Sequence, residues 1–404
     1  MPLSPALRSA LAGLCALTLA MGVGRFAYTP VLPLMQTDLA LSIAVAGYIA
    51  SANFAGYLAG ALMAIWVPAS LRRTAYVSAI LISVATTLLM TLLHAPLLIA
   101  LVRLLSGIAS AFVLVHGSAI VLDRLARERR AGLSSLLYAG VGTGIALSAL
   151  LVALMSQLQA DSFTHWLALG LACALLAPAA LTLRDESVPL STHTPGQATS
   201  LPATAQTAAA SDLKSDRALR WLVLAYGCLG FGYVITATFL VVIMRGNPDW
   251  QAYEMLVWLL VGLAAAPSNL LWMRIAARMG PWRTMTLAYL LEAIGVAAVV
   301  TGNSLSMILL GALLLGGTFM GITALGLTTA RSLSQRASGP VIARMTAAFG
   351  LGQIVGPAFG GWLAEQSGGF AWPSAFAALA LLGAAAIVWF CGRRLGSPAS
   401  AKAA

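Results

Sequence analysis

The stretch "GVGRFAYTP" (residues 22–30) places an arginine, Arg25, inside an apolar run that extends from Leu11 to Met35. A guanidinium is charged at any physiological pH, and at the centre of a membrane helix it costs ~2.5–3.5 kcal/mol on insertion scales. Arg25 is therefore predicted to face protein or a water-filled cavity rather than lipid. The glycines beside it, Gly22 and Gly24, leave room for close approach of a helix or for a ligand.

The composition around this stretch is that of an integral membrane protein. The 404 residues are 60% hydrophobic and only 9% charged, with a mean hydropathy of +0.90, whereas a soluble domain is about 25% charged. The four cysteines fall in apolar runs without metal-ligand spacing and are interpreted as small packing residues. We therefore expect neither a metal site nor a cofactor.

Twelve apolar segments are long enough to cross a bilayer, for which a helix needs about 20 residues. The first is predicted to be a membrane span rather than a cleaved signal peptide, because its apolar pattern continues past Arg25 and similar segments follow. The predicted spans are 9–35, 43–66, 74–93, 96–122, 134–156, 164–183, 220–244, 253–273, 282–301, 305–330, 340–364 and 371–391. Pro30 and Pro33 are expected to kink the first span toward its outer end.

The basic residues predict how the spans are oriented. All of the 23 lysines and arginines except Arg25, Arg103 and Arg245 fall on one side of the membrane in this arrangement. The positive-inside rule assigns that side, with both termini and the long middle loop, to the cytoplasm. We expect a multi-pass protein of the bacterial cytoplasmic (inner) membrane. The net charge of +11 is then explained by topology and lipid contact, so nucleic-acid binding is not expected.

The chain is predicted to consist of two related halves. Residues 1–184 and 220–404 would each form a six-helix bundle, the second with a short cytoplasmic tail, and residues 185–219, rich in Ala, Thr, Ser and Pro, would form a flexible cytoplasmic linker. "GVGR" at 22–25 aligns with "GFGY" at 230–233, which pairs Arg25 with Tyr233. Two parallel repeats place a substrate site between them near the midplane. Because both repeats lie in one chain, a monomer is expected to form the whole substrate site.

Two motifs give the chain a resemblance to the major facilitator superfamily. "RLLSG" (103–107) is similar to the fourth-span motif of that superfamily, and "GQIVGPAFGG" (352–361) fits the pattern G-x-x-x-G-P-x-x-G-G through Gly352, Gly356, Pro357, Gly360 and Gly361. The segments 22–42 and 46–62 resemble the YbfB/YjiJ-like group. The resemblance implies an all-α integral membrane fold of twelve transmembrane helices in two six-helix pseudo-repeats, and it implies transport without naming a substrate.

The chain also departs from the superfamily pattern, among other places in its fifth span and in the turn after its eighth span. In proton-coupled drug antiporters the glycine–proline motif lies in the fifth span, where this chain has Ile145 in place of the proline. The turn after the eighth span keeps Arg278 and Gly280 but has Ala277 where an aspartate would be.

By the same resemblance, the first span of each three-helix unit lines the central cavity, and Arg25 is a candidate to bind an anionic or zwitterionic solute. The other candidate substrate-binding residues are Tyr28, Asn53, Tyr138, Tyr233, Thr236 and Gln353. Each of them could instead be a hydrogen bonder between packed helices. Arg25 likewise could hold helices together through backbone carbonyls or a carboxylate.

Four further residues are candidates for coupling or gating. Glu292 is the main acid within a span, and His116 could titrate near neutral pH. Arg103 occupies the position that the resemblance links to proton transfer or gating. Asp123 lies at a span end, where a helix-capping or loop role is the alternative. For Glu292, His116 and Arg103 the alternative is a role in helix pairing or packing.

The sequence thus predicts a secondary active transporter of a small organic solute, working by alternating access and coupled to protons. The alternatives are a multidrug or metabolite efflux antiporter in which Arg25 is structural, and a membrane receptor or scaffold that does not transport. An enzyme is not expected, because the glycine runs lie within membrane helices and no P-loop, metal cluster or nucleophile elbow is present. Lipid, the solute and a proton are the expected partners.

Overall fold

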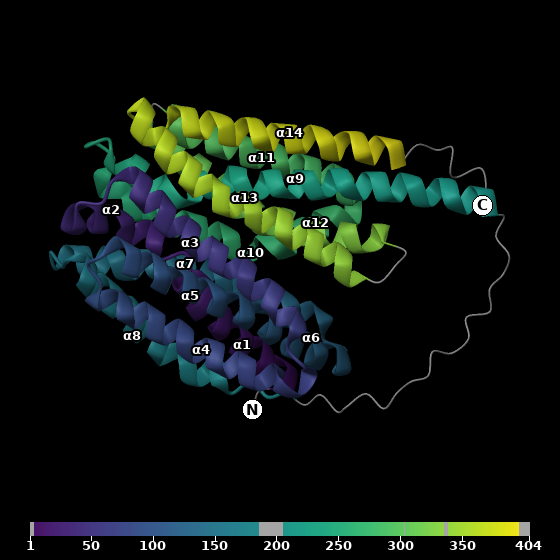
Figure 1. The fold of residues 1–404 in the computed structure, drawn as a ribbon, viewed down its shortest axis with the longest axis horizontal. Coiled ribbons are helices and arrows are strands. Elements are labelled where there is room, and N and C mark those ends of the chain that lie inside the picture. The colour runs from purple at the N-terminus through teal and green to yellow at the C-terminus, as the bar shows by residue number, and fades with distance from the viewer. Residues whose placement is uncertain (1–3, 186–204, 303, 335–337, 396–404) are drawn as a thin grey trace.

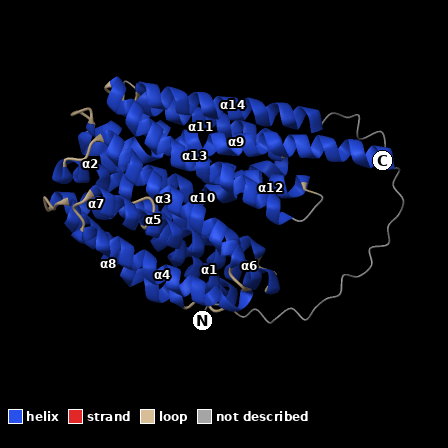
Figure 2. Ribbon diagram, in the orientation of Figure 1, coloured by secondary structure: helices blue, strands red, loops and turns tan. Residues whose placement is uncertain are grey.

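The computed structural model describes residues 4–185, 205–302, 304–334 and 338–395. Over these residues the chain is helical and contains no strand, as Figure 2 shows. Within these ranges, twelve helices are long and apolar enough to cross a membrane. The predicted all-α membrane fold is confirmed.

The helices form two bundles, stacked one above the other in Figure 1. The N-terminal bundle contains α1 (Pro5–Leu17), η1 (Thr18–Val23), α2 (Tyr28–Leu39), α3 (Ile43–Met63), α4 (Arg72–Leu89), α5 (Pro96–Phe112), η5 (Val113–Gly117), α6 (Ser118–Arg127), α7 (Ser134–Gln157) and α8 (Ser162–Leu181). The C-terminal bundle contains α9 (Ala205–Arg245), α10 (Glu254–Met279), α11 (Pro281–Thr301), α12 (Leu305–Leu333), α13 (Ser338–Ser367) and α14 (Ala371–Leu395).

Local sequence signals explain where several helices begin. The side chains of Ser42, Asp161 and Ser304 accept hydrogen bonds from backbone N–H groups in the first turns of α3, α8 and α12. The bonds from Thr164 also hold the pKa of the Asp161 carboxyl below its usual value. Pro96 and Pro281 stand at the first position of α5 and α11, where a missing N–H costs nothing.

The structure differs from the predicted linker over residues 205–219. We expected an irregular segment over 185–219, but α9 begins at Ala205 and runs without interruption to Arg245. The physical reason is composition: "AQTAAASDLK" at 205–214 is rich in alanine, which has the highest helix propensity, and it continues directly into the apolar seventh span. The linker residues 186–204 and the predicted tail residues 396–404 lie outside the described residues.

The first membrane span is broken in its middle, which the sequence did not predict. α1 passes into a turn of π-helix, and residues 24–27 form turns before α2 begins at Tyr28. Pro30 has no N–H to donate to Phe26, and the Phe26 carbonyl accepts from Thr29 instead, at 3.2 Å. The helix is interrupted at residues 24–27, just before Pro30, and Arg25 lies inside this break.

The two bundles touch at glycines. α3 packs against α13, and α7 packs against α10. A Cβ atom on Gly142 of α7 would lie 2.6 Å from the carbonyl oxygen of Gly262 on α10, and one on Gly47 of α3 would overlap the carbonyl oxygen of Pro357 on α13. Small residues let helix backbones meet at this distance, so these positions set how closely the bundles pack.

The glycine–proline motif of α13 serves two helix contacts at once. Gly352 and Gly356 face α9 of the same bundle, where a Cβ on Gly352 would overlap the Gly227 carbonyl. Pro357 and Gly361 face α3 of the other bundle, and a Cβ on Gly361 would lie 2.6 Å from the Ile43 oxygen. Gly360 packs on Ile235 of α9. One short motif therefore ties the two bundles together through a single helix.

Three hydrogen bonds join the bundles toward the side of the molecule opposite the termini, hereafter the far side. The Ala44 N–H at the start of α3 donates to Glu365 near the end of α13, at 2.9 Å. Thr29 donates to the Ala237 carbonyl at 2.8 Å, and the Trp258 indole donates to Ser148 at 3.3 Å. The far-side ends of the bundles are therefore held against each other.

Replacing Gly142 with alanine should loosen the contact between α7 and α10. The added methyl would meet backbone atoms of α10, which cannot turn away as a flexible side chain can. We expect a lower melting temperature for the purified protein in detergent. The matched control is Gly383→Ala on α14, where no atom lies within 4 Å of the new Cβ and alanine should gain about 0.5–1 kcal/mol of helix stability. Equal melting temperatures for the two variants would contradict the contact.

Candidate functional site

Arg103 donates hydrogen bonds to the backbone carbonyls that the break in the first span leaves free. Its Nη1 donates to the Gly24 carbonyl at 2.6 Å and its Nη2 to the Arg25 carbonyl at 2.7 Å. Ser106, one turn further along α5, donates to the same Gly24 carbonyl at 3.1 Å. Broken helices persist at membrane depth where other side chains satisfy the freed backbone groups. The Arg103 guanidinium therefore acts as the structural partner of the break.

Arg25 points from this break into the junction of the two bundles. Its Nη2 donates at 2.7 Å to the side-chain oxygen of Gln353 on α13. Gln353 in turn donates to the hydroxyl of Tyr233 on α9. Sequence alignment of the halves pairs Arg25 with Tyr233, and in the structure both residues meet at the same glutamine.

Aromatic rings surround the rest of the Arg25 guanidinium. Its carbon lies 4.0 Å from the ring centroid of Tyr57, 4.6 Å from that of Phe54 and 5.6 Å from that of Phe26. The negative face of an aromatic ring attracts a cation, and the attraction grows where water is excluded. The rings stabilise the charge without neutralising it.

No carboxylate of the described residues pairs with either buried arginine. Arg25 is 4% exposed and Arg103 is 3% exposed, and the ion pairs of the described chain involve other arginines. The Nε atom of each guanidinium has no hydrogen-bond partner among the described residues. The centre of the protein therefore carries two positive charges whose protein partners are neutral, and such a site attracts an anion.

A small cavity adjoins both arginines. About 10 Å³ of it is open to the centre of a water molecule, which is room for about one water. Polar and apolar groups from both bundles line it, namely Arg25, Phe26, Tyr28, Thr29, Ala50, Asn53, Phe54, Arg103, Val234, Ala237 and Thr238. We call it the arginine cavity. A second, apolar cavity lies beyond Phe26 and Ala237, which line both.

The structure brings together five of the seven residues predicted to bind substrate. Arg25, Tyr28 and Asn53 line the arginine cavity, Tyr233 lines the apolar cavity, and Gln353 joins Arg25 to Tyr233. The other two, Tyr138 and Thr236, line neither cavity.

The residues predicted for coupling do not gather around Arg25. Glu292 is fully buried on α11 and accepts a hydrogen bond from Thr318 on α12, while its second oxygen has no partner among the described residues. His116 lies in the π-helical turn η5 against Phe112, with ring centroids 5.3 Å apart, and lines neither cavity.

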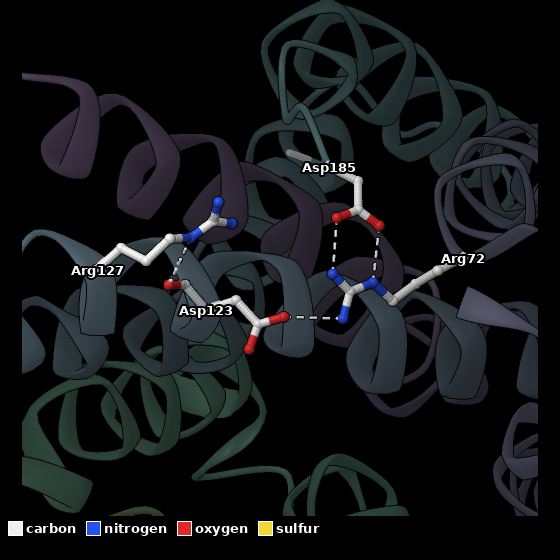
Figure 3. Close-up of polar contacts among 4 residues, drawn as sticks. All are labelled: Arg72, Asp123, Arg127 and Asp185. Atoms are coloured by element: carbon white, nitrogen blue, oxygen red, sulfur yellow. Dashed lines mark hydrogen bonds and ion pairs between the residues drawn. The ribbon is translucent and has the colours of Figure 1, made fainter. Parts of the chain in front are cut away.

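Asp123 belongs to a separate charge cluster on the side that carries the termini, drawn in Figure 3. Its carboxylate lies 2.9 Å from Arg72 at the start of α4, and Arg72 also binds Asp185, after α8, with contacts of 2.6 and 2.7 Å. Arg127 donates to the Asp123 carbonyl at 3.3 Å. Arg72 therefore joins the start of α4 to α6 and to the segment after α8, and none of these charged residues lines the arginine cavity.

The two glycines of the opening stretch have different surroundings. A Cβ on Gly22 would overlap the backbone of Gly144 on α7, so Gly22 allows close helix approach. A Cβ on Gly24 would lie 2.7 Å from the Ala20 oxygen of its own span, so Gly24 permits the tight turn that frees its carbonyl for Arg103. Neither glycine lines a cavity.

Sequence reasoning missed the aromatic part of the site. Phe26 follows Arg25 directly, and Phe54 and Tyr57 lie three residues apart on α3, next to Asn53. Residues three apart share a helix face, so an aromatic pair beside a polar residue in an apolar helix was a usable signal. Which helix this pair would face could not be read from the sequence.

The fold and this site together define a membrane transporter with two helical bundles and a charged centre between them. Known transporters share the fold. The chain matches a structure of a mutant of the nucleoside transporter NupG with a TM-score of 0.71 and 16% identity, covering 95% of this chain and 98% of that one. It matches a bacterial homologue of the human lysosomal transporter Spinster, in an inward-facing and unoccupied conformation, with a TM-score of 0.63, 16% identity and coverage of 97% and 98%.

Residues 17–389 match the model of the family described as uncharacterised MFS-type transporter YbfB. The chain belongs to this family of major facilitator transporters, as the residues of the first two spans predicted. No curated protein matches the chain.

Replacing Arg103 with lysine should destabilise the protein even though the charge is kept. A lysine ammonium cannot reproduce the planar fork that bonds two adjacent carbonyls, and a hydrogen bond to a charged group contributes about 1.5–3 kcal/mol. We expect a loss of at least that size, measured by thermal unfolding in detergent. Arg73→Lys, at an exposed site at the start of α4, should leave the melting temperature unchanged. An unaltered melting temperature for the Arg103 variant would show that the break does not depend on it.

Proposed function

We propose that the protein is a secondary active transporter of a small organic anion or zwitterion, bound by Arg25 and moved by alternating access of the two bundles. One observation carries the proposal: a permanently charged guanidinium is buried where the bundles meet, and its protein partners are the neutral side chain of Gln353 and three aromatic rings. A carboxylate would supply both the missing charge and bidentate hydrogen bonds.

The contacts between bundles support alternating access. The glycine contacts of α3 with α13 and of α7 with α10 offer two lines along which the bundles can rock. The hydrogen bonds at Ala44, Thr29 and Trp258 hold the far side together. We propose that the bundles separate on the side of the termini to let the solute reach Arg25, which is 4% exposed in the described conformation.

The distribution of basic residues supports the orientation of this arrangement. The positive-inside rule places the termini in the cytoplasm of a bacterium and the far side outside the cytoplasmic membrane. The described conformation would then be closed to the exterior. The internal duplication supports a working monomer.

Electrostatics at the arginine cavity disfavour organic cations as solutes. Arg25 and Arg103 both line this cavity, and neither is paired with a carboxylate of the described residues. A second cation entering a water-poor site beside them would meet unscreened repulsion. Export of lipophilic cations is therefore the weaker assignment.

Glu292 is the residue that we propose to carry the proton. It is fully buried, it makes one hydrogen bond, from Thr318, and its other oxygen has no partner among the described residues. Phe319, the residue after Thr318, stacks on Tyr233 with ring centroids 5.3 Å apart and planes within 6°. Through α12, a change in the charge of Glu292 would reach Tyr233, Gln353 and finally Arg25.

Replacing Arg25 with lysine or alanine should abolish solute binding. Purified wild-type protein should be stabilised by at least one member of a panel of monocarboxylates and amino acids, by about 2.7 kcal/mol when that ligand is present at a hundred times its Kd. The Arg25 variants should show no such shift in melting temperature and no uptake in proteoliposomes.

The control for this experiment is Arg73→Ala, which removes an exposed arginine and should respond to ligand as the wild type does. If both Arg25 variants still bind and transport the stabilising carboxylate, Arg25 is a structural residue and the proposal fails.

Replacing Glu292 with glutamine should uncouple transport from protons. The amide oxygen can still accept from Thr318, but the side chain no longer titrates. We expect proteoliposome uptake of the stabilising carboxylate to lose its dependence on a pH gradient while exchange of labelled for unlabelled solute continues. Asp249→Asn, at an exposed position on the far side, should keep the dependence. Gradient-driven accumulation by the Glu292 variant would assign proton coupling elsewhere.

A further inference from the structure

The apolar cavity beyond Phe26 is built differently from the arginine cavity. Its lining is wholly aliphatic and aromatic, and half of the lining residues are aromatic: Phe26, Ile145, Tyr233, Ala237, Trp258, Val261, Leu315 and Phe319. The residues come from the broken first span and α7 of one bundle and from α9, α10 and α12 of the other. Like the arginine cavity, it lies between the bundles.

The two polar side-chain atoms among the lining residues, the Tyr233 hydroxyl and the Trp258 indole nitrogen, already make hydrogen bonds within the protein. The Tyr233 hydroxyl accepts from Gln353, and the Trp258 indole N–H donates to Ser148 across the bundle junction at 3.3 Å. A solute group in this cavity would therefore find apolar surface and few free hydrogen-bonding partners. Burying a polar group there without a partner is costly, and burying an apolar group is favourable.

Phe26 stands between the two cavities and belongs to the broken part of the first span. It lines both cavities and packs edge-on against Phe319, with ring centroids 6.3 Å apart. Its backbone lies in the turns at 24–27 rather than in a helix. A rotation of its side chain would join the two cavities into one elongated site with a cation at one end.

We propose, resting on the function proposed above, that the solute is a monocarboxylate with a hydrophobic tail of about the size of an aromatic ring. The carboxylate meets Arg25 in the arginine cavity, and the tail fills the apolar cavity after Phe26 turns aside. About 10 Å³ of the apolar cavity is open to the centre of a water molecule, so the cavity has to widen, by the movement of Phe26, before it can hold a ring.

The test compares carboxylates of equal charge and increasing tail size by thermal stabilisation of the purified full-length protein. The probes are acetate, butyrate, hexanoate, benzoate and phenylacetate, with benzyl alcohol as an uncharged analogue. Burial of a methylene group should tighten binding about fourfold, so phenylacetate should bind at least tenfold more tightly than acetate. Benzyl alcohol, which lacks the charge, should give no shift.

A pair of variants on α10 tests the location of the tail. Val261→Thr replaces one methyl of the cavity wall by a hydroxyl of nearly the same volume, and it should weaken phenylacetate severalfold while leaving acetate unchanged. Val257→Thr makes the same replacement one helical turn away, at a buried residue that does not line the cavity, and should leave the ratio of the two affinities unchanged.

Equal affinity for acetate and phenylacetate, or the same effect of both valine variants, would overturn the assignment of the tail. If acetate, butyrate and phenylacetate bind equally and Arg25→Ala abolishes all of them, the proposed function stands and only the hydrophobic tail is wrong. If none of the carboxylates stabilises the wild type, or if Arg25→Ala binds them normally, the proposed function fails together with this inference.

Discussion

The structure depends on how two guanidinium groups are accommodated in an apolar interior. Arg103 gives its donors to the carbonyls of Gly24 and Arg25, which are free because the first span is broken there. The break and the arginine require each other, since freed carbonyls at membrane depth need donors and a buried guanidinium needs acceptors. With the backbone held in this way, the Arg25 side chain reaches across to the other bundle.

The partners that Arg25 contacts at the bundle junction are uncharged side chains. Gln353 accepts one hydrogen bond from the guanidinium, and the rings of Phe54 and Tyr57 stabilise its charge without cancelling it. A carboxylate partner within the protein would compete with an anionic solute, and an unpaired guanidinium in a dry site would be strongly destabilising. Neutral partners from opposite bundles lie between these extremes, so a solute could replace them as the bundles move.

The glycine contacts determine how closely the two bundles pack around Arg25, where a solute would replace its neutral partners. At Gly142 and Gly47 the backbones of the two bundles approach as closely as a missing Cβ allows. On α13, Pro357 and Gly361 face α3 of the other bundle, whereas Gly352 and Gly356 face α9 of the same bundle. The motif of the eleventh span was recognisable in the sequence. The sequence did not show that the motif contacts two different helices, because periodicity along one helix does not say which helix each face meets.

The number of spans and the all-helical fold follow from the sequence, because runs of about twenty apolar residues leave a chain no other way to cross a bilayer. The residues of the first two spans indicated the family. The sequence also marked Arg25 as a residue that must avoid lipid. Tertiary structure alone decided the break in the first span, the role of Arg103 and the aromatic surroundings of Arg25. These depend on side chains such as Tyr57, Arg103 and Gln353, which lie far apart in the chain and meet only when the helices pack.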